Sequence, residues 1–180
     1  MPNYPKINTD IKQRLYVNLI IENHPTFKGA MGKYFKKHTH LFNIEAIIED
    51  MMAICSKRKY TFIDGVGEDF SDGSECKTGT LHLNGISKAE ITNVKTKQGN
   101  LKKGGIRCVI LNPKLEKLHF VFIPKAAVIK LMTTSNGTIK KSTSIWLSYT
   151  YNKDSFSRCF EKYGIIEYPT FKQLAMEVNH

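Results

Sequence analysis

Asp69-Phe70-Ser71-Asp72-Gly73-Ser74-Glu75-Cys76-Lys77 is the stretch of this chain that says most about its fold and its chemistry. Asp72-Gly73 is a signal for a tight turn, so the stretch predicts a hairpin with an acid before the turn and Glu75-x-Lys77 after it. Side chains two residues apart point to the same face of a strand. A carboxylate and an ammonium group are therefore expected to share one small site, with Cys76 on the opposite face.

The same region is unusually acidic for so basic a protein. Five of the chain's 16 acidic residues fall between positions 64 and 75, and no Lys or Arg occurs from Asp64 to Cys76, although the net charge is +11. Such a cluster suggests a bound cation. Its members are Asp64, Glu68, Asp69, Asp72 and Glu75.

With its acid, short hairpin and Glu75-x-Lys77, the sequence resembles the PD-(D/E)xK nucleases, and residues 67–78 look most like the small type II restriction endonucleases. The pattern extends over roughly residues 42–123. The resemblance implies an α/β fold with a restriction-endonuclease-like core, in which a mixed central β-sheet is flanked by helices. It also implies that Asp69, Glu75 and Lys77 are catalytic and that Asp69 and Glu75 bind the metal, Mg²⁺.

These residue types suit the hydrolysis of a phosphodiester. Mg²⁺ lowers the pKa of a bound water and clamps phosphate oxygens. It prefers oxygen ligands and keeps several waters, so two carboxylates and a DNA phosphate are enough to hold it. The resemblance implies that Lys77 holds the attacking water or offsets developing negative charge. We therefore expect a Mg²⁺-dependent type II restriction endonuclease that cuts double-stranded DNA.

The identity of the first acid depends on the length of the hairpin loop. A two-residue loop at Asp72-Gly73 places Glu68 on the face of Glu75. A three-residue loop over 71–73, with Gly73 in the left-handed region, places Asp69 opposite Glu75 instead. We favour the three-residue loop. The remaining candidates for the first metal ligand are Glu68, Asp64 and Asp72.

A basic segment follows the acidic cluster and is expected to contact DNA phosphates, since a pI near 9.5 favours a polyanion as partner. Lys102 and Lys103 are its candidate DNA-binding residues. The segment from 88 to 118 has only two acidic residues but contains Lys88, Lys95, Lys97, Lys102, Lys103, Arg107, Lys114 and Lys117.

Hydrophobic periodicity predicts one domain over residues 1–180, with a mainly helical part at 1–57, a catalytic sheet at 58–123 and a mixed part at 124–180. The helix over 42–57 carries Glu45 and Glu49, and the resemblance makes either of them a candidate to assist the metal, because some enzymes of that family place an acid on a helix in this position. The other expected helices are 9–23, 126–132, 154–159 and a short one after Thr170, with a short helix or loop at 27–37. The expected strands are 60–64, 68–70, 74–83, 89–94, 106–111, 118–123 and 143–151, the first ones forming a meander.

Composition also limits the environment and the alternatives. Cys55, Cys76, Cys108 and Cys159 have no paired spacing, so we expect reduced thiols. No apolar run reaches membrane-spanning length and the first residues are too polar for a signal peptide, which predicts a cytoplasmic protein. Cutting both strands of a symmetric site predicts a homodimer. The alternatives are a repair or junction-resolving nuclease of the same superfamily and a non-catalytic DNA-binding module with a structural hairpin.

Overall fold

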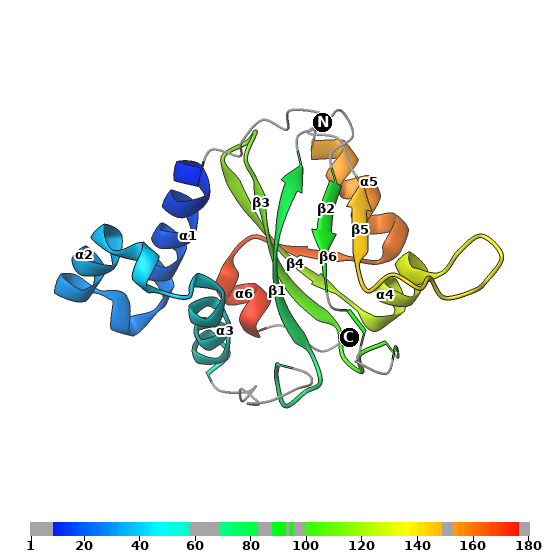
Figure 1. The fold of residues 1–180 in the computed structure, drawn as a ribbon, viewed down its shortest axis with the longest axis horizontal. Helices are drawn as coiled ribbons and strands as arrows, with labels where there is room; N and C mark the ends of the chain where they lie inside the picture. The colour runs from blue at the N-terminus through cyan, green and yellow to red at the C-terminus, as the bar shows by residue number, and fades with distance from the viewer. Residues whose placement is uncertain are drawn as a thin grey trace.

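The structure is a computed structural model that describes residues 9–57, 69–82, 88–92, 94–95, 99, 101–148 and 153–176. Its described strands form one six-stranded mixed sheet in the order β5-β2-β1-β3-β4-β6 (Figure 1). The strands are β1 (Glu75–His82), β2 (Lys88–Ile91), β3 (Ile106–Asn112), β4 (Lys117–Ile123), β5 (Ile145–Ser148) and β6 (Ile166–Tyr168).

The centre of the sheet is a parallel pair. β1 and β3 run parallel, with Lys77 beside Cys108, whereas every other pair of neighbouring strands is antiparallel. The described part of the expected meander, the Phe70–Ser74 hairpin and the β1–β2 pair, is antiparallel as predicted, and the parallel pairing of β3 with β1 follows it. Two parallel neighbouring strands need a connection that carries the chain back to the end of the sheet where the first strand began. β2 runs antiparallel to β1, on the side away from β3, and forms part of this connection.

Helices cover both faces of this sheet (Figure 1), so the chain has the mixed α/β architecture that the sequence predicted. α1, α3 and α6 contribute to the core on one face, and α4 and α5 to the core on the other. None of the described helices has the length and apolar character needed to cross a membrane. The helices are α1 (Thr9–Asn23), η1 (Pro25–Phe27), α2 (Gly29–Lys37), η2 (Thr39–Leu41), α3 (Ile44–Cys55), α4 (Lys125–Met132), α5 (Lys153–Tyr163) and α6 (Phe171–Met176).

Local capping explains several helix ends. The side chain of Asn43 accepts a hydrogen bond from the backbone N–H of Ala46 and so caps α3 at its N-terminus. Gly164 has φ +70° directly after α5, as expected for a left-handed residue that ends a helix. Thr170 accepts from the backbone N–H of Gln173 at the start of α6. The start at Thr170 follows the sequence prediction, whereas α3 is shorter than the expected 42–57 and α5 is longer than the expected 154–159.

Strand alternation divides the interior into two cores. Cys76 and Val109 face α1, α3 and α6, while Leu81 and Cys108 face α4 and α5. All seven residues of β3 are buried, as expected for a central strand covered on both sides. The thiols of all four cysteines are free. Glu75 and Lys77 alternate with Cys76 and therefore lie on the α4 side of β1.

The hairpin strands before β1 are only partly described. The expected strand at 60–64 and residue Glu68 lie outside the described residues. Of the expected strand at 68–70, the structure shows a bridge at Phe70. β6 was not predicted, because three residues between two helices are too few to show an alternating pattern.

Candidate active site

The hairpin before β1 has the three-residue loop. The N–H of Phe70 donates to the carbonyl of Ser74 (3.2 Å), and the N–H of Gly73 donates to the carbonyl of Phe70 (2.9 Å). Gly73 has φ +79°, in the left-handed region that this loop requires. Phe70 therefore faces Ser74, and Asp69 comes opposite Glu75. The prediction of a three-residue loop is confirmed.

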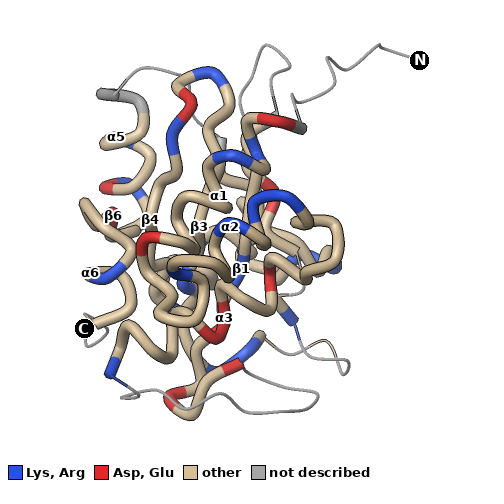
Figure 2. The backbone as a smooth tube through the Cα atoms, turned by 90° about the vertical axis from the view of Figure 1, so that its left-hand side faces the viewer, with Lys and Arg blue, Asp and Glu red and all other residues tan. Residues whose placement is uncertain are grey.

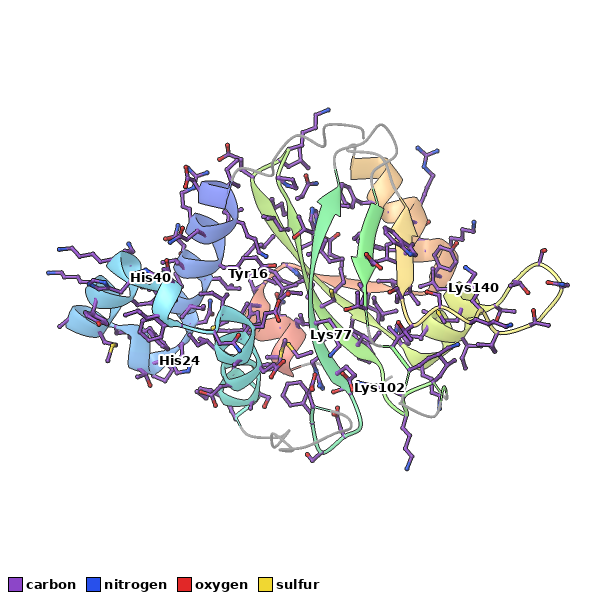
Figure 3. All side chains as sticks on the ribbon, in the orientation of Figure 1. Tyr16, His24, His40, Lys77, Lys102 and Lys140 are labelled. Carbon is purple, nitrogen blue, oxygen red and sulfur yellow. The ribbon has the colours of Figure 1, made fainter. Side chains whose placement is uncertain are left out.

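Asp69, Glu75 and Lys77 form one cluster at the start of β1. Figure 3 labels Lys77 of this cluster. Nζ of Lys77 lies 2.7 Å from Oε2 of Glu75 and 3.5 Å from Oδ2 of Asp69. Oδ2 of Asp69 also accepts the backbone N–H of Cys76 at 2.8 Å. The Glu75 side chain is only 2% exposed, against 20% for Lys77 and 21% for Asp69. A single ammonium group thus contacts both carboxylates that the sequence assigned to the metal.

Lys102 adds a second cation to this cluster. Its Nζ lies 2.6 Å from Oε1 of Glu75, so each carboxylate oxygen of Glu75 has an ammonium partner. A carboxylate this deeply buried needs such partners, because desolvation of an unpaired charge costs several kcal/mol. The sequence assigned Lys102 and Lys103 to DNA phosphates. The structure brings Lys102 to Glu75 and leaves Lys103 exposed.

The charges of the cluster change the pKa of Lys77. Burial alone would lower this pKa, but the hydrogen bond to Glu75 and the negative charges of Glu75 and Asp69 outweigh burial. The pKa of Lys77 therefore lies above its ordinary value. Lys77 is therefore a charged ammonium at neutral pH, and it donates to Asp69.

Two glycines let the backbone after Lys102 pack closely against the hairpin that carries Glu75. A Cβ on Gly104 would lie 1.8 Å from the carbonyl oxygen of Gly73, and a Cβ on Gly105 would lie 2.4 Å from the ring of Phe122. Only glycine permits this approach. The carbonyl of Gly105 also accepts the N–H of Glu75 at 2.9 Å. Sequence analysis missed this contact, although paired glycines before a strand are a signal of close backbone packing.

Arg107 holds the turn from the other face of the sheet. It is fully buried, donates to Oδ2 of Asp72 at 2.8 Å and to Oγ of Ser74, and lies 5.3 Å from the centroid of the Phe70 ring. Burial would raise the pKa of Asp72, but hydrogen bonds from Arg107 and Ser74 and the charge of Arg107 lower it overall. Asp72 is thus engaged in the turn, and Arg107 is not available to a DNA phosphate.

Of the two candidate acids on α3, Glu45 and Glu49, the charges of the cluster act on the pKa of Glu49. Burial and the negative charge of Asp69 raise the pKa of Glu49, more than the charge of Lys77 lowers it. Oε1 of Glu45 instead accepts the hydroxyl of Thr78 at 3.2 Å. The remaining candidate acids, Asp64 and Glu68, lie outside the described residues.

The described residues contain no group of three or more His, Cys, Asp or Glu side chains that could hold a metal ion. The cavity bounded by Glu75, Lys77 and Lys102 has a volume of only about 10 Å³. That is close to the least space that one water molecule needs. With Lys102 on Glu75, the cluster is closed by the protein's own cations.

Basic positions are not confined to one element. On the side drawn in Figure 2, Lys and Arg are spread over helices and loops.

The sequence and the structure were also compared with known proteins. No family model, no curated protein and no solved structure gave a significant match.

Proposed function

We propose that this protein is a Mg²⁺-dependent type II restriction endonuclease that hydrolyses phosphodiester bonds of double-stranded DNA at a short specific site. The observation that carries the proposal is the carboxylate pair of Asp69 and Glu75, joined by the ammonium of Lys77 at a three-residue hairpin. The pair brings two hard oxygen donors to one position, that of the Lys77 ammonium, at 3.5 and 2.7 Å from it. Such a position suits Mg²⁺ in the presence of water and a phosphate.

The geometry supports a metal at these two residues. One ammonium already contacts both carboxylates, so both lie within reach of a single cation. Mg²⁺ would supply an activated water and charge neutralisation on the phosphate. Asp69 and Glu75 would hold it. Lys77, as an ammonium next to both carboxylates, would hold the attacking water and stabilise negative charge on the phosphate.

Lys102 has to release Glu75 before a metal can use Oε1. Both oxygens of Glu75 are ion-paired, and the remaining space is about 10 Å³. A DNA phosphate offers the Lys102 ammonium an alternative partner of the same charge. Lys102 therefore first pairs with Glu75 and, once DNA is bound, contacts a phosphate instead. Lys103, exposed beside it, contacts phosphate from the outset.

The fold supports the same proposal at a coarser level. A mixed sheet with helices on both faces carries Glu75 and Lys77 on a central strand, with α3 packed on the opposite face. We assign it a restriction-endonuclease-like core. One cluster cuts one strand, so the active form is a homodimer. We place the protein in the cytoplasm, where free thiols such as those of Cys76 and Cys108 remain reduced.

One observation favours a second candidate. Both oxygens of Glu75 already have partners, as expected of a structural ion-pair network in a DNA-binding module without catalysis. A repair or junction-resolving nuclease would use the same cluster on a branched substrate. The three candidates therefore differ in what the protein does to DNA.

The test is incubation with plasmid and with a four-way junction, each with Mg²⁺ or with a chelator. Discrete plasmid fragments that require Mg²⁺ support restriction, and preferred cutting of the junction supports a resolving nuclease. Lys77→Ala should abolish cutting, whereas Lys33→Ala, an exposed residue of α2, should not. Retardation of DNA with no cutting under any condition would contradict the nuclease proposal and favour the binding module.

A further inference from the structure

A pocket of about 590 Å³ lies between α1, the start of α3 and β1. Its volume falls within the range of small-molecule sites. Thr78 lines it from β1 and, as the neighbour of Lys77, points to the opposite face of the strand. Tyr16 and His40, both in its lining, lie on the α1 side of the sheet in Figure 3, away from Lys77 and Lys102. The pocket is therefore separate from the carboxylate cluster.

One wall of the pocket is apolar and aromatic. Phe42 is half-buried, and its ring is held by edge contacts with Phe27 and Phe35, at centroid distances of 5.7 and 5.0 Å. Ile44 and the buried Tyr16 add further apolar surface. A ring fixed in this way loses little conformational entropy on contact with a ligand, and aromatic faces stack with planar rings.

The rest of the lining is polar and includes two lysines and one carboxylate. Lys12 of α1 and Lys37 in the last turn of α2 are exposed and line the pocket, together with His40. The carboxylate of Glu45, also in the lining, accepts the hydroxyl of Thr78. Two ammonium groups against one carboxylate favour an anion, and lysine is a common phosphate ligand.

We propose that this pocket binds a nucleoside monophosphate, with its base against Phe42 and its phosphate at Lys12 and Lys37. The aromatic wall selects a planar ring, the lysines select the phosphate, and the volume accommodates both in one ligand. A free mononucleotide and the 5′-terminal nucleotide of a DNA strand share this chemistry. The proposal does not depend on nuclease activity, because it uses the opposite face of β1.

Isothermal titration calorimetry of the full chain in a chelator tests the proposal without cleavage. The probes are 2′-deoxyadenosine 5′-monophosphate, 2′-deoxyadenosine, inorganic phosphate and a 5′-phosphorylated single-stranded decamer. The monophosphate should bind at one site, at least about tenfold tighter than the nucleoside or phosphate alone. Tighter binding of the decamer would assign the site to a DNA end, and tighter binding of the monophosphate to a free nucleotide; both support the proposal.

Three variants separate the parts of the site. Lys12→Glu with Lys37→Glu should weaken the monophosphate at least about tenfold, because two charge-assisted contacts are reversed. Phe42→Leu keeps an apolar side chain and should weaken the monophosphate but not inorganic phosphate. Lys33→Glu, on α2 but outside the lining, is the matched control. The proposal is overturned if neither the monophosphate nor the decamer binds, or if the double variant and the control bind equally, with circular dichroism showing both folded.

Discussion

Nζ of Lys102 lies 2.6 Å from Oε1 of Glu75, and Nζ of Lys77 lies 2.7 Å from Oε2 of the same carboxylate. The buried carboxylate is thereby neutralised from both sides by the protein itself. Because Lys102 is 15% exposed and Glu75 only 2%, the lysine is the member of the pair that can reach a partner from solvent. If Glu75 binds Mg²⁺ as proposed, Lys102 and the metal compete for the same carboxylate.

Lys102→Ala should therefore tighten the binding of Mg²⁺ or Mn²⁺ in the absence of DNA. Removing the ammonium frees one oxygen of Glu75, and a charge-assisted contact of this kind corresponds to about a tenfold change in affinity. Calorimetric titration with Mn²⁺ measures the effect, and Lys103→Ala serves as the neighbouring control. Unchanged or weaker metal binding in Lys102→Ala would show that the two cations do not compete.

Asp69→Asn should reduce plasmid cleavage by at least about 100-fold, the scale expected when one electrostatic contact to the transition state is lost. The fold should survive, because the Asp69 side chain is 21% exposed and an amide oxygen can still accept the N–H of Cys76. Cleavage rate and thermal melting of the same preparation give the two readouts. Full activity in this variant would move the first metal ligand to another acid, with Glu68→Gln as the next variant to assay.

Asp72→Ala should act on stability instead. Its loss leaves the buried guanidinium of Arg107 without its carboxylate, which costs about 3 kcal/mol for an ion pair of this kind. Urea unfolding monitored by circular dichroism measures this change. A variant with unchanged stability would mean that the turn does not depend on the Asp72–Arg107 pair.

The Asp72–Arg107 pair also predicts how the stability of the protein changes as pH falls. The pKa of Asp72 is lowered in the folded protein, so its stabilising contribution is complete above the ordinary value of 3.8 and is lost as pH falls through the lower folded pKa. Below pH 4 the wild-type protein should lose stability more steeply than Asp72→Ala. Parallel pH profiles of the two proteins would contradict this assignment.

The hairpin was predictable because its geometry is local. The Asp72-Gly73 signal and the left-handed preference of glycine determine the loop, and the loop aligns Asp69 with Glu75. The contacts of Lys102 and Arg107 were not predictable from local patterns. Both residues lie about 30 positions from their partners, and the parallel pairing of β1 with β3 brings them together.

Lys103 should contribute to DNA binding through charge alone. It is exposed beside the cluster, so Lys103→Ala should make the slope of log K against log salt shallower by about 0.9, the value for one phosphate contact. Fluorescence anisotropy with a labelled duplex at several salt concentrations measures the slope. Lys33→Ala is the control with the same change of charge, and an equal slope for both variants would place the DNA on another face.

Under the proposed function, the described residues of each chain form one Asp69–Glu75–Lys77 site, and two chains then supply one site for each strand. We therefore expect sedimentation in the presence of a cleavable duplex and Ca²⁺ to give a protein mass of about twice 20.6 kDa. A mixed dimer of wild-type and Lys77→Ala chains should then nick a supercoiled plasmid, because one intact site cuts one strand. Linear product from the mixed dimer at the wild-type rate would show that a single site cuts both strands in turn. A protein that stays monomeric on DNA and only nicks it would contradict the restriction assignment while leaving the chemistry of the cluster in place.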